Sequence, residues 1–227
     1  MLYPLSYQSV ESMPLYLDVS LKCKEAEQFP PKIEQLFTDK RVMNSCAKKM
    51  RRVAGIAERG REEVFIGLGG NIGNTAEIFK AVIAELKLSS ALDHFECSSL
   101  YETTPVETEI PQRNYLNMVC RFFTDVELCV LKLFFREIEA RHGKKPKAKT
   151  APRVIDIDLL LYGRRSYQTP DLVVPHPRWQ ERLFVLIPLY DIAEHIEVER
   201  DGTVERFSLS TLIATAQQKD NAKVRRV

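Results

Sequence analysis

The sequence has little of what marks a membrane, secreted or nucleic-acid-binding protein. No apolar run reaches about 18 residues, so we expect no membrane span. Lys and Arg total 33 against 31 Asp and Glu, which gives a formal charge of +2. Such a small net charge does not indicate a nucleic-acid-binding protein. The opening Met-Leu-Tyr-Pro-Leu has no basic n-region and acidic residues follow early, so we expect neither a secretory signal nor a mitochondrial transit peptide.

Paired cysteine motifs are also lacking. The cysteines are odd in number and none forms a C-x-x-C pair: they are Cys23, Cys46, Cys97, Cys120 and Cys129. This pattern indicates neither a disulfide framework nor a zinc site. We therefore expect a cytoplasmic protein whose thiols are reduced and mostly buried.

The common nucleotide-binding motifs are missing as well. The glycines between residues 67 and 73 do not fit G-x-G-x-x-G, because Ile72 stands where a motif starting at Gly67 needs its third glycine. The P-loop pattern does not occur either. We interpret these glycines as a tight strand-to-helix turn that lets a ligand approach the backbone.

The first part of the chain differs in character from the rest. Pro30 and Pro31 interrupt it, and a basic stretch follows, made up of Arg41, Lys48, Lys49, Arg51, Arg52, Arg59 and Arg61. A solvated linker accounts for this stretch; a nucleic-acid or lipid patch is the alternative, although no interleaved aromatics support it. We predict an N-terminal extension of unknown role over residues 1–62 and a domain over residues 63–220.

From residue 63 the pattern becomes regular. Apolar and β-branched runs predict strands over residues 64–68, 95–101, 116–123 and 154–162, with a helix after the first and after the third. This order predicts an α+β fold with a ferredoxin-like βαββαβ core, in which helices pack on a mainly antiparallel sheet. Further elements are expected beyond the core: an apolar segment over residues 183–192, a turn at Asp201-Gly202 and an amphipathic segment over residues 209–216.

Capping residues predict where the two core helices begin and end. Asn74 and Glu77 have the spacing of a capping box for the first helix, and Thr124 and Glu127 have the same spacing for the second. Gly143 is a natural stop for the second helix.

The sharpest chemical feature is Asp156 and Asp158 within an otherwise apolar strand. Residues i and i+2 of a strand point to the same face, so the two carboxylates project together. Their charge is costly unless something compensates it, and a hard divalent cation such as magnesium is one compensation. The alternative is a solvated pair, or a pair bound to Arg153.

Two cationic loops and a polar pair accompany these carboxylates. Residues 141–153 and 175–182 are rich in Lys and Arg, which suits a polyphosphate ligand but also an ordinary charged loop. His176 could donate to a phosphate or be a loop histidine. Tyr115 and Asn117 share a strand face, which suits a planar heterocycle; a sheet-edge Tyr and a turn-forming Asn are the alternative.

Five stretches of the sequence carry a resemblance to one family. They are Phe65-Ile-Gly-Leu-Gly-Gly-Asn71, Ser98-Ser-Leu-Tyr-Glu-Thr-Thr-Pro105, Asn114-Tyr-Leu-Asn117, Lys149-Thr-Ala-Pro-Arg-Val-Ile-Asp-Ile-Asp158, and Val174-Pro-His176 followed by Arg182-Leu-Phe184. In this order they resemble the 6-hydroxymethyl-7,8-dihydropterin pyrophosphokinases over about residues 63–200. The resemblance implies an ATP-dependent diphosphotransferase of folate synthesis that releases AMP. The implied partners are ATP and the pterin, with no nucleic acid and no membrane, and we expect a monomer.

The resemblance also implies roles for individual residues. Asp156 and Asp158 look like ligands of two magnesium ions that accompany ATP, with Arg153 as a phosphate clamp. The implied ATP-binding set is Glu139, Arg153, Leu159, His176 and Arg182. The implied pterin-binding set is Thr103, Thr104, Pro105, Val106, Tyr115, Asn117 and Phe184, with Tyr115 and Phe184 stacking on the ring.

Two departures from the family pattern bear on turnover. Lys144 stands where many members have Arg, which keeps the charge but loses the bidentate fork, and we count it with the catalytic residues. Loop 144–151 is one residue shorter than is typical and lacks an Arg-Trp pair, so closure would use Lys147 or Lys149. We expect an active, slower enzyme; the alternative is a catalytically impaired relative that binds nucleotide and pterin.

Two further alternatives concern the N-terminal part. Residues 53–60 faintly resemble the terminal strand of dihydroneopterin aldolase, so the extension is either a lineage-specific addition or a shortened fusion remnant. A module that binds RNA through residues 40–61 is the remaining reading, and it leaves Asp156 and Asp158 unexplained.

Overall fold

A computed structural model describes residues 60–106, 111–145, 151–169 and 172–227, all within the second of the two units into which the chain divides, residues 55–227. The elements run in the order β1 (Glu62–Gly70), α4 (Thr75–Leu88), β2 (Asp93–Cys97), β3 (Tyr101–Thr103), β4 (Tyr115–Thr124), α5 (Leu128–Arg141), β5 (Asp156–Tyr162), β6 (Tyr167–Thr169), β7 (Leu172–Val174), α6 (Leu183–Tyr190), β8 (His195–Arg200), β9 (Thr203–Ser208), α7 (Leu209–Ala216) and β10 (Val224–Arg226).

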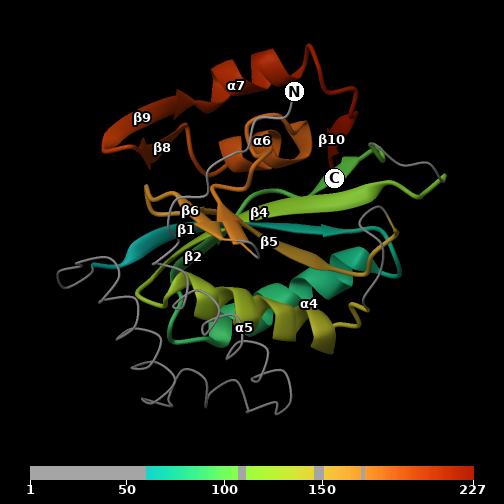
Figure 1. The fold of residues 1–227 in the computed structure, drawn as a ribbon. Coiled ribbons are helices and arrows are strands. Elements are labelled where there is room, and N and C mark those ends of the chain that lie inside the picture. The colour runs from blue at the N-terminus through green and yellow to red at the C-terminus, as the bar shows by residue number, and fades with distance from the viewer. Residues whose placement is uncertain (1–59, 107–110, 146–150, 170–171) are drawn as a thin grey trace, which may run out of the picture. The chain divides into compact units, whose positions relative to one another are not determined.

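The main sheet has the strand order β10-β3-β4-β1-β5, with β2 also paired to β4 (Figure 1). Each of its pairings is antiparallel. Strand β4 lies between β1 and β3, so the crossover through α4 is split by an inserted strand. This arrangement confirms the predicted α+β, ferredoxin-like core.

Helices cover both faces of this sheet (Figure 1). Helices α4 and α5 lie on one face, where Phe122 of β4 packs against Phe135 of α5 with ring centroids 6.3 Å apart. Helices α6 and α7 lie on the other face, over a buried cluster that includes Trp179 and Leu186. Burial of these apolar side chains supplies the main stabilisation of the fold.

The helix boundaries agree with the predictions in part. Helix α5 ends at Arg141 and Gly143 follows with φ 89°, as the predicted stop requires. The second capping box is wrong: the N-cap is Glu127, because the Thr124 hydroxyl donates to the carbonyl of Ala91 and accepts from the N–H of Val126.

The first capping box lacks its side-chain bond. Asn74 is the N-cap of α4, as predicted, but in the described part of the chain its side chain makes no cap hydrogen bond. Glu77 accepts from Lys80 at 2.7 Å instead.

The predicted strand over residues 95–101 is two strands, β2 and β3. Between them the Ser98 hydroxyl accepts from the N–H of Val119 at 3.0 Å and donates to the carbonyl of Ser99 at 2.8 Å. The Ser98 side chain therefore takes one backbone group of Val119 out of the ladder, while the N–H of Ser98 still donates to the carbonyl of Val119 at 2.8 Å.

The C-terminal part contains both predicted and unpredicted elements. Asp201 and Gly202 have φ of 51° and 75° and form the turn of the β8–β9 hairpin, as predicted. The apolar and amphipathic segments form α6 and α7, whereas β10, which pairs with β3, had no sequence signal. Among the helices of the described segments, none is long and apolar enough to cross a membrane.

The described cysteines are thiols of mixed exposure. Cys120 is buried, whereas Cys97 and Cys129 are partly exposed. The prediction of mostly buried thiols therefore holds for one of these three, and Cys23 and Cys46 lie outside the described residues.

Candidate active site

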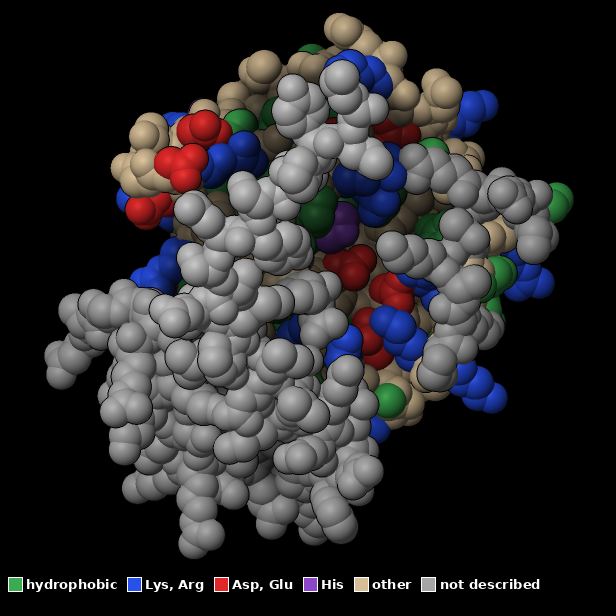
Figure 2. Space-filling model, in the orientation of Figure 1, with side chains coloured by type: hydrophobic (Ala, Val, Ile, Leu, Met, Phe, Trp, Pro, Cys, Tyr) green, Lys and Arg blue, Asp and Glu red, His purple; other side chains and the backbone are tan. Residues whose placement is uncertain are grey.

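A cavity of about 1080 Å³ opens where the ends of several elements meet. Its wall comes from β1, β3, β4, β5, the loop before α6, and the ends of α6 and α7. The lining residues are Gly69, Thr103, Thr104, Val106, Tyr115, Asn117, Arg153, Asp156, Asp158, His176, Arg178, Gln180, Glu181, Arg182, Phe184, Thr215, Ala216, Lys219, Asp220 and Asn221. Figure 2 shows acidic and basic side chains gathered around a histidine where this face is hollowed.

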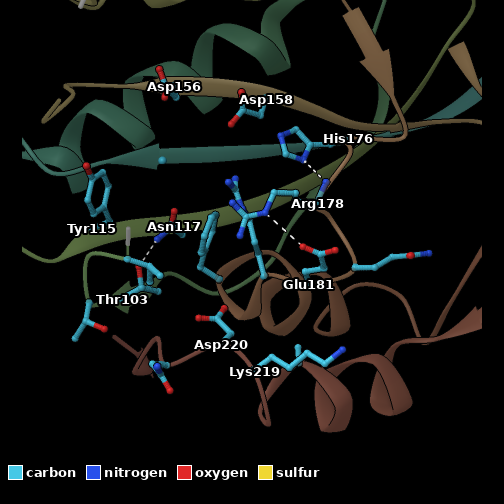
Figure 3. A pocket seen from close by; sticks show the side chains of 18 of the residues that line it. Thr103, Tyr115, Asn117, Asp156, Asp158, His176, Arg178, Glu181, Lys219 and Asp220 are labelled. Atoms are coloured by element: carbon cyan, nitrogen blue, oxygen red, sulfur yellow. Dashed lines mark hydrogen bonds and ion pairs between the residues drawn. The ribbon is translucent and has the colours of Figure 1, made fainter. Parts of the chain in front are cut away.

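Asp156 and Asp158 both line the cavity, as the alternation along β5 predicts (Figure 3). Their partners across the sheet are Gly69 and Gly67 of β1. Residues opposite each other in a ladder project to the same face, so these glycines place no side chain beside the carboxylates. The strand therefore presents two acidic groups to an open space.

The two carboxylates have different partners. Asp156 is buried, accepts from Lys144 Nζ at 2.7 Å and pairs with the Arg153 guanidinium. Asp158 is exposed to the cavity, and among the described residues no hydrogen bond or ion pair joins its side chain to a neighbour. Desolvation of its carboxyl group, with the nearby Asp156 charge, raises the pKa of Asp158.

Glu139 of α5 connects this charge cluster to the backbone of β5. Its Oε1 accepts from Lys144 Nζ at 2.7 Å and from the N–H of Ile157 at 2.6 Å. Burial raises the pKa of Glu139, whereas the Lys144 charge and the Ile157 N–H oppose that shift. Lys144 thus bridges Glu139 and Asp156.

Asn71 holds the chain that enters β5. The side-chain oxygen of Asn71 accepts from the backbone N–H of Arg153 at 2.9 Å, and the backbone N–H of Asn71 donates to the carbonyl of Arg153 at 2.8 Å. A Cβ on Gly70 would lie 2.5 Å from the carbonyl oxygen of Val154. The predicted close approach at these glycines therefore exists, but at Gly70 the approaching group is this chain's own backbone; Gly69 does line the cavity.

His176 is oriented by its own loop. Its Nδ1 accepts from the N–H of Arg178 at 3.3 Å, so the neutral ring carries its proton on Nε2. Burial lowers the pKa of His176, and the Arg182 and Arg178 charges lower it further while Asp158 opposes them. The ring lies beside Asp158 (Figure 3) and is a neutral N–H donor at neutral pH.

Polar and aromatic groups line the other side of the cavity. Asn117 Nδ2 donates to the Thr103 hydroxyl at 2.7 Å, and both side chains are buried. Tyr115 donates its hydroxyl to Gln112 Oε1 at 2.7 Å. The Arg182 guanidinium lies over the Phe184 ring, 5.4 Å from its centroid.

A second cavity of about 400 Å³ adjoins the first. It is lined by Lys132, Phe135, Arg136, Glu139, Lys144, Ile157, Asp158, Leu159, Leu172, Val173, His176 and Pro177. Asp158 and His176 line both cavities.

The structure brings nearly all the predicted site residues to these two cavities. Glu139, Lys144 and Leu159 line the smaller one, and the others, except Pro105, line the larger one. Pro105 lines neither. Residues 146–150, with the predicted closure residues Lys147 and Lys149, lie outside the described residues.

Sequence reasoning missed the C-terminal contribution to the larger cavity. Thr215 lies within the predicted amphipathic segment, Lys219 and Asp220 follow it, and none of the three belongs to a short motif. Arg178 and Glu181 could have been predicted as site residues, because both belong to the cationic loop that contains His176.

The donor set around Asp156 and Asp158 fits magnesium that is also bound to a phosphate ligand. Within the described segments no group of three or more His, Cys, Asp or Glu side chains could hold a metal. Two carboxylates on one cavity wall are nevertheless the protein ligands that magnesium commonly takes when waters and substrate phosphates complete its shell.

Comparison with known proteins gives a consistent set of matches. The model of the family 7,8-dihydro-6-hydroxymethylpterin-pyrophosphokinase (HPPK) matches residues 65–194. The 2-amino-4-hydroxy-6-hydroxymethyldihydropteridine pyrophosphokinase of Bacillus subtilis is 38% identical over 135 residues, which cover 60% of this chain and 80% of that protein. The protein of the same name from Synechocystis is 34% identical over 155 residues, 68% of this chain and 75% of that protein.

A solved structure shares the fold. The wild-type HPPK-DHPS of Plasmodium falciparum with pteroate is similar with a TM-score of 0.51 and 13% identity. The similarity covers 75% of this chain and 48% of that one.

Proposed function

Because the chain belongs to the 7,8-dihydro-6-hydroxymethylpterin-pyrophosphokinase family, we propose that it transfers pyrophosphate from ATP to 6-hydroxymethyl-7,8-dihydropterin in folate biosynthesis. The hydroxymethyl oxygen forms a bond to the β-phosphorus of ATP. The bond between that phosphorus and the oxygen bridging to the α-phosphorus breaks, AMP leaves, and the hydroxyl proton passes to solvent.

The two cavities suit the two substrates. The larger one takes the pterin, with Tyr115 and Phe184 against the faces of the ring and Asn117 and Thr103 at its polar edge. The smaller one takes the nucleoside part of ATP. Asp158 and His176 line both cavities, so the triphosphate lies at their junction, where the hydroxymethyl group can reach it.

Magnesium is the cofactor of this proposal, held by Asp156 and Asp158, with two ions accompanying ATP. When bound, it supplies Lewis-acid neutralisation of phosphate oxygens. Arg153, Arg178 and Arg182 line the same cavity and bind phosphate oxygens directly. His176 Nε2–H donates to a phosphate oxygen without adding charge.

The protein itself contributes positioning and electrostatic stabilisation, with no covalent intermediate. Glu139 fixes β5 through the N–H of Ile157, and Lys144 fixes Asp156. A monomeric working unit remains a prediction from the sequence. A cytoplasmic location remains a prediction from the sequence.

The observation that carries the proposal is the pair of carboxylates on β5 at the junction of two adjoining cavities. The test is a coupled assay of AMP release with ATP, the hydroxymethyl-dihydropterin and magnesium. We expect AMP formation that stops on chelation of magnesium and falls at least about 1000-fold in Asp156→Ala and Asp158→Ala, since each removes a ligand of the charge-neutralising ion.

A matched control is Asp125→Ala, which removes an exposed carboxylate just before α5. It should retain the wild-type rate. AMP release by the wild type no faster than by the Asp156 and Asp158 variants would refute the proposal. Tight binding of a non-hydrolysable ATP analogue in that case would identify the impaired, substrate-binding relative.

A further inference from the structure

The turn between α7 and β10, residues 217–223, borders the larger cavity through Lys219, Asp220 and Asn221. Figure 3 shows Lys219 and Asp220 on the side of the cavity opposite Asp156 and Asp158. The family match ends at residue 194, so it gives this turn no role. We call residues 217–223 the C-terminal turn.

Asp220 uses both of its carboxylate oxygens within the protein. Oδ2 accepts from the N–H of Leu183 at 2.8 Å, and Oδ1 accepts from the N–H of Ala222 at 2.9 Å. Leu183 is the first residue of α6, and the first N–H groups of a helix have no partner inside the helix. Arg182, the N-cap residue, has a side chain that only donates and cannot accept from this N–H. Asp220 therefore caps α6 from a distant part of the chain.

The capped residue lies between two residues of the cavity wall. Arg182 and Phe184 flank Leu183, both line the cavity, and the guanidinium lies over the ring. A hydrogen bond to the N–H of Leu183 fixes the backbone from which both side chains extend. The direction of the Phe184 ring thus depends on a carboxylate that is not its neighbour in sequence.

The other end of the C-terminal turn holds the opposite wall. The N–H of Thr104 donates to the carbonyl of Lys223 at 3.1 Å, and the N–H of Lys223 donates to the Thr104 hydroxyl at 3.0 Å. Thr104 follows Thr103, which accepts from Asn117. One short turn therefore links the aromatic wall and the polar wall that the proposed function assigns to the pterin.

We propose that Asp220 is a positioning residue for the pterin: by capping α6 it holds the Phe184 ring opposite Asn117 and Thr103. This inference rests on the proposed function, because the pterin is its ligand. Asp220 acts through Phe184 and need not touch the reacting atoms.

The test measures pterin affinity by calorimetry in the presence of a non-hydrolysable ATP analogue. Asp220→Ala should weaken pterin binding about tenfold, in the range that loss of a helix cap allows. Asp220→Asn keeps one amide oxygen that can accept from the N–H of Leu183, so it should weaken binding about threefold at most. The matched control, Glu194→Ala, removes an exposed carboxylate just after α6 and should bind as the wild type does.

A double-mutant cycle separates positioning from a general structural effect. If Asp220 acts through Phe184, then Asp220→Ala in a Phe184→Ala background should change pterin affinity less than about twofold. Additive losses would overturn the inference. If Asp220→Ala is not folded at the assay temperature, Asp220→Asn replaces it in the same cycle.

Amide hydrogen exchange at Leu183, followed by NMR, gives a readout that needs no substrate. Exchange should accelerate in Asp220→Ala and not in Glu194→Ala. Unchanged pterin affinity in Asp220→Ala, with an active wild type, would overturn the inference and leave the proposed function intact. A wild type that neither binds the pterin nor forms AMP would overturn both, even where Leu183 exchange accelerates.

Discussion

Lys144 donates to two acidic side chains, and both of them are tied to β5. Glu139 accepts from the N–H of Ile157, and Asp156 is part of the strand. Two carboxylates that share one ammonium group repel each other once that group is removed. Lys144 therefore stabilises the strand that presents the acidic pair, besides any contact with substrate.

Lys144→Met should lower the free energy of unfolding by about 2 kcal/mol at pH 8, below the value for a fully buried pair because the Lys144 side chain is 38% exposed. Burial already raises the pKa of Glu139, and loss of the Lys144 charge raises it further. A carboxyl whose pKa is raised on folding stabilises the protein below its unfolded pKa, and that contribution is lost as the pH rises through the folded pKa. The loss should therefore be smaller at pH 5 than at pH 8, as measured by urea denaturation.

Lys144→Arg is the conservative control, since it keeps the charge, and it should stay within about 1 kcal/mol of the wild type. An equal loss at both pH values in Lys144→Met would contradict this account of the charge cluster.

The residues of the site differ in how far sequence could predict them. The shared face of Asp156 and Asp158 follows from the period of a strand, and the structure has both on one cavity wall. Glu139 could be named only through family resemblance, because its contact with Ile157 spans two elements that the sequence does not place side by side. Pro105 was carried over with its neighbours and lines neither cavity.

At the scale of elements, the end of β1 depends on a glycine. A Cβ at Gly70 would lie 2.5 Å from the carbonyl oxygen of Val154, and backbone cannot move aside as a side chain can. Gly70→Ala should lower the free energy of unfolding by about 3 kcal/mol, as overpacking does. It should also reduce AMP release, because Arg153 and Asp156 follow the displaced segment. Urea denaturation and the AMP assay check both effects.

Gly67→Ala is the matched control in the same strand. A Cβ there would meet Leu160 at 3.6 Å, an ordinary contact, so the stability should change by less than about 1 kcal/mol. Equal destabilisation by the two substitutions would show that loss of glycine itself, and not the close approach, causes the effect.

The capping boxes show why element boundaries were harder to predict than elements. Thr124 and Glu127 have the right spacing, but β4 runs through Thr124 and its hydroxyl bonds to the carbonyl of Ala91, outside the helix. Gly143 was predictable because a left-handed residue after a helix needs no distant partner. Sequence signals therefore predicted a helix boundary correctly where the contacts that set it involve only neighbouring residues.

At the scale of the whole chain, the family match begins at residue 65 and the described residues begin at 60. A chain that starts at residue 60 should form AMP within about twofold of the full-length rate, since it keeps every described residue that lines the two cavities. Limited proteolysis followed by the AMP assay checks this expectation. Loss of activity on cleavage before residue 60 would assign the predicted extension a part in catalysis.

The architecture was predictable because it follows from the order of strands and helices. Two long-range contacts were not predictable. Strand β10 pairs with β3, and Asp220 accepts a hydrogen bond from the N–H of Leu183, but no periodic pattern in the sequence marks either pair of partners. The first joins three residue pairs and the second is one hydrogen bond, both between segments far apart in sequence, and composition and spacing carry no information about either.

Strand β5 is the last strand of its sheet, so one row of its backbone groups faces away from β1. Glu139 accepts from the N–H of Ile157 on this side, and the N–H of His176 donates to the carbonyl of Leu160. Unpaired strand edges are templates for aggregation with other chains. Glu139 and His176, both proposed to bind ATP, therefore also occupy hydrogen-bonding groups at the open edge of β5. We expect substitutions at Glu139 to lower solubility as well as catalysis.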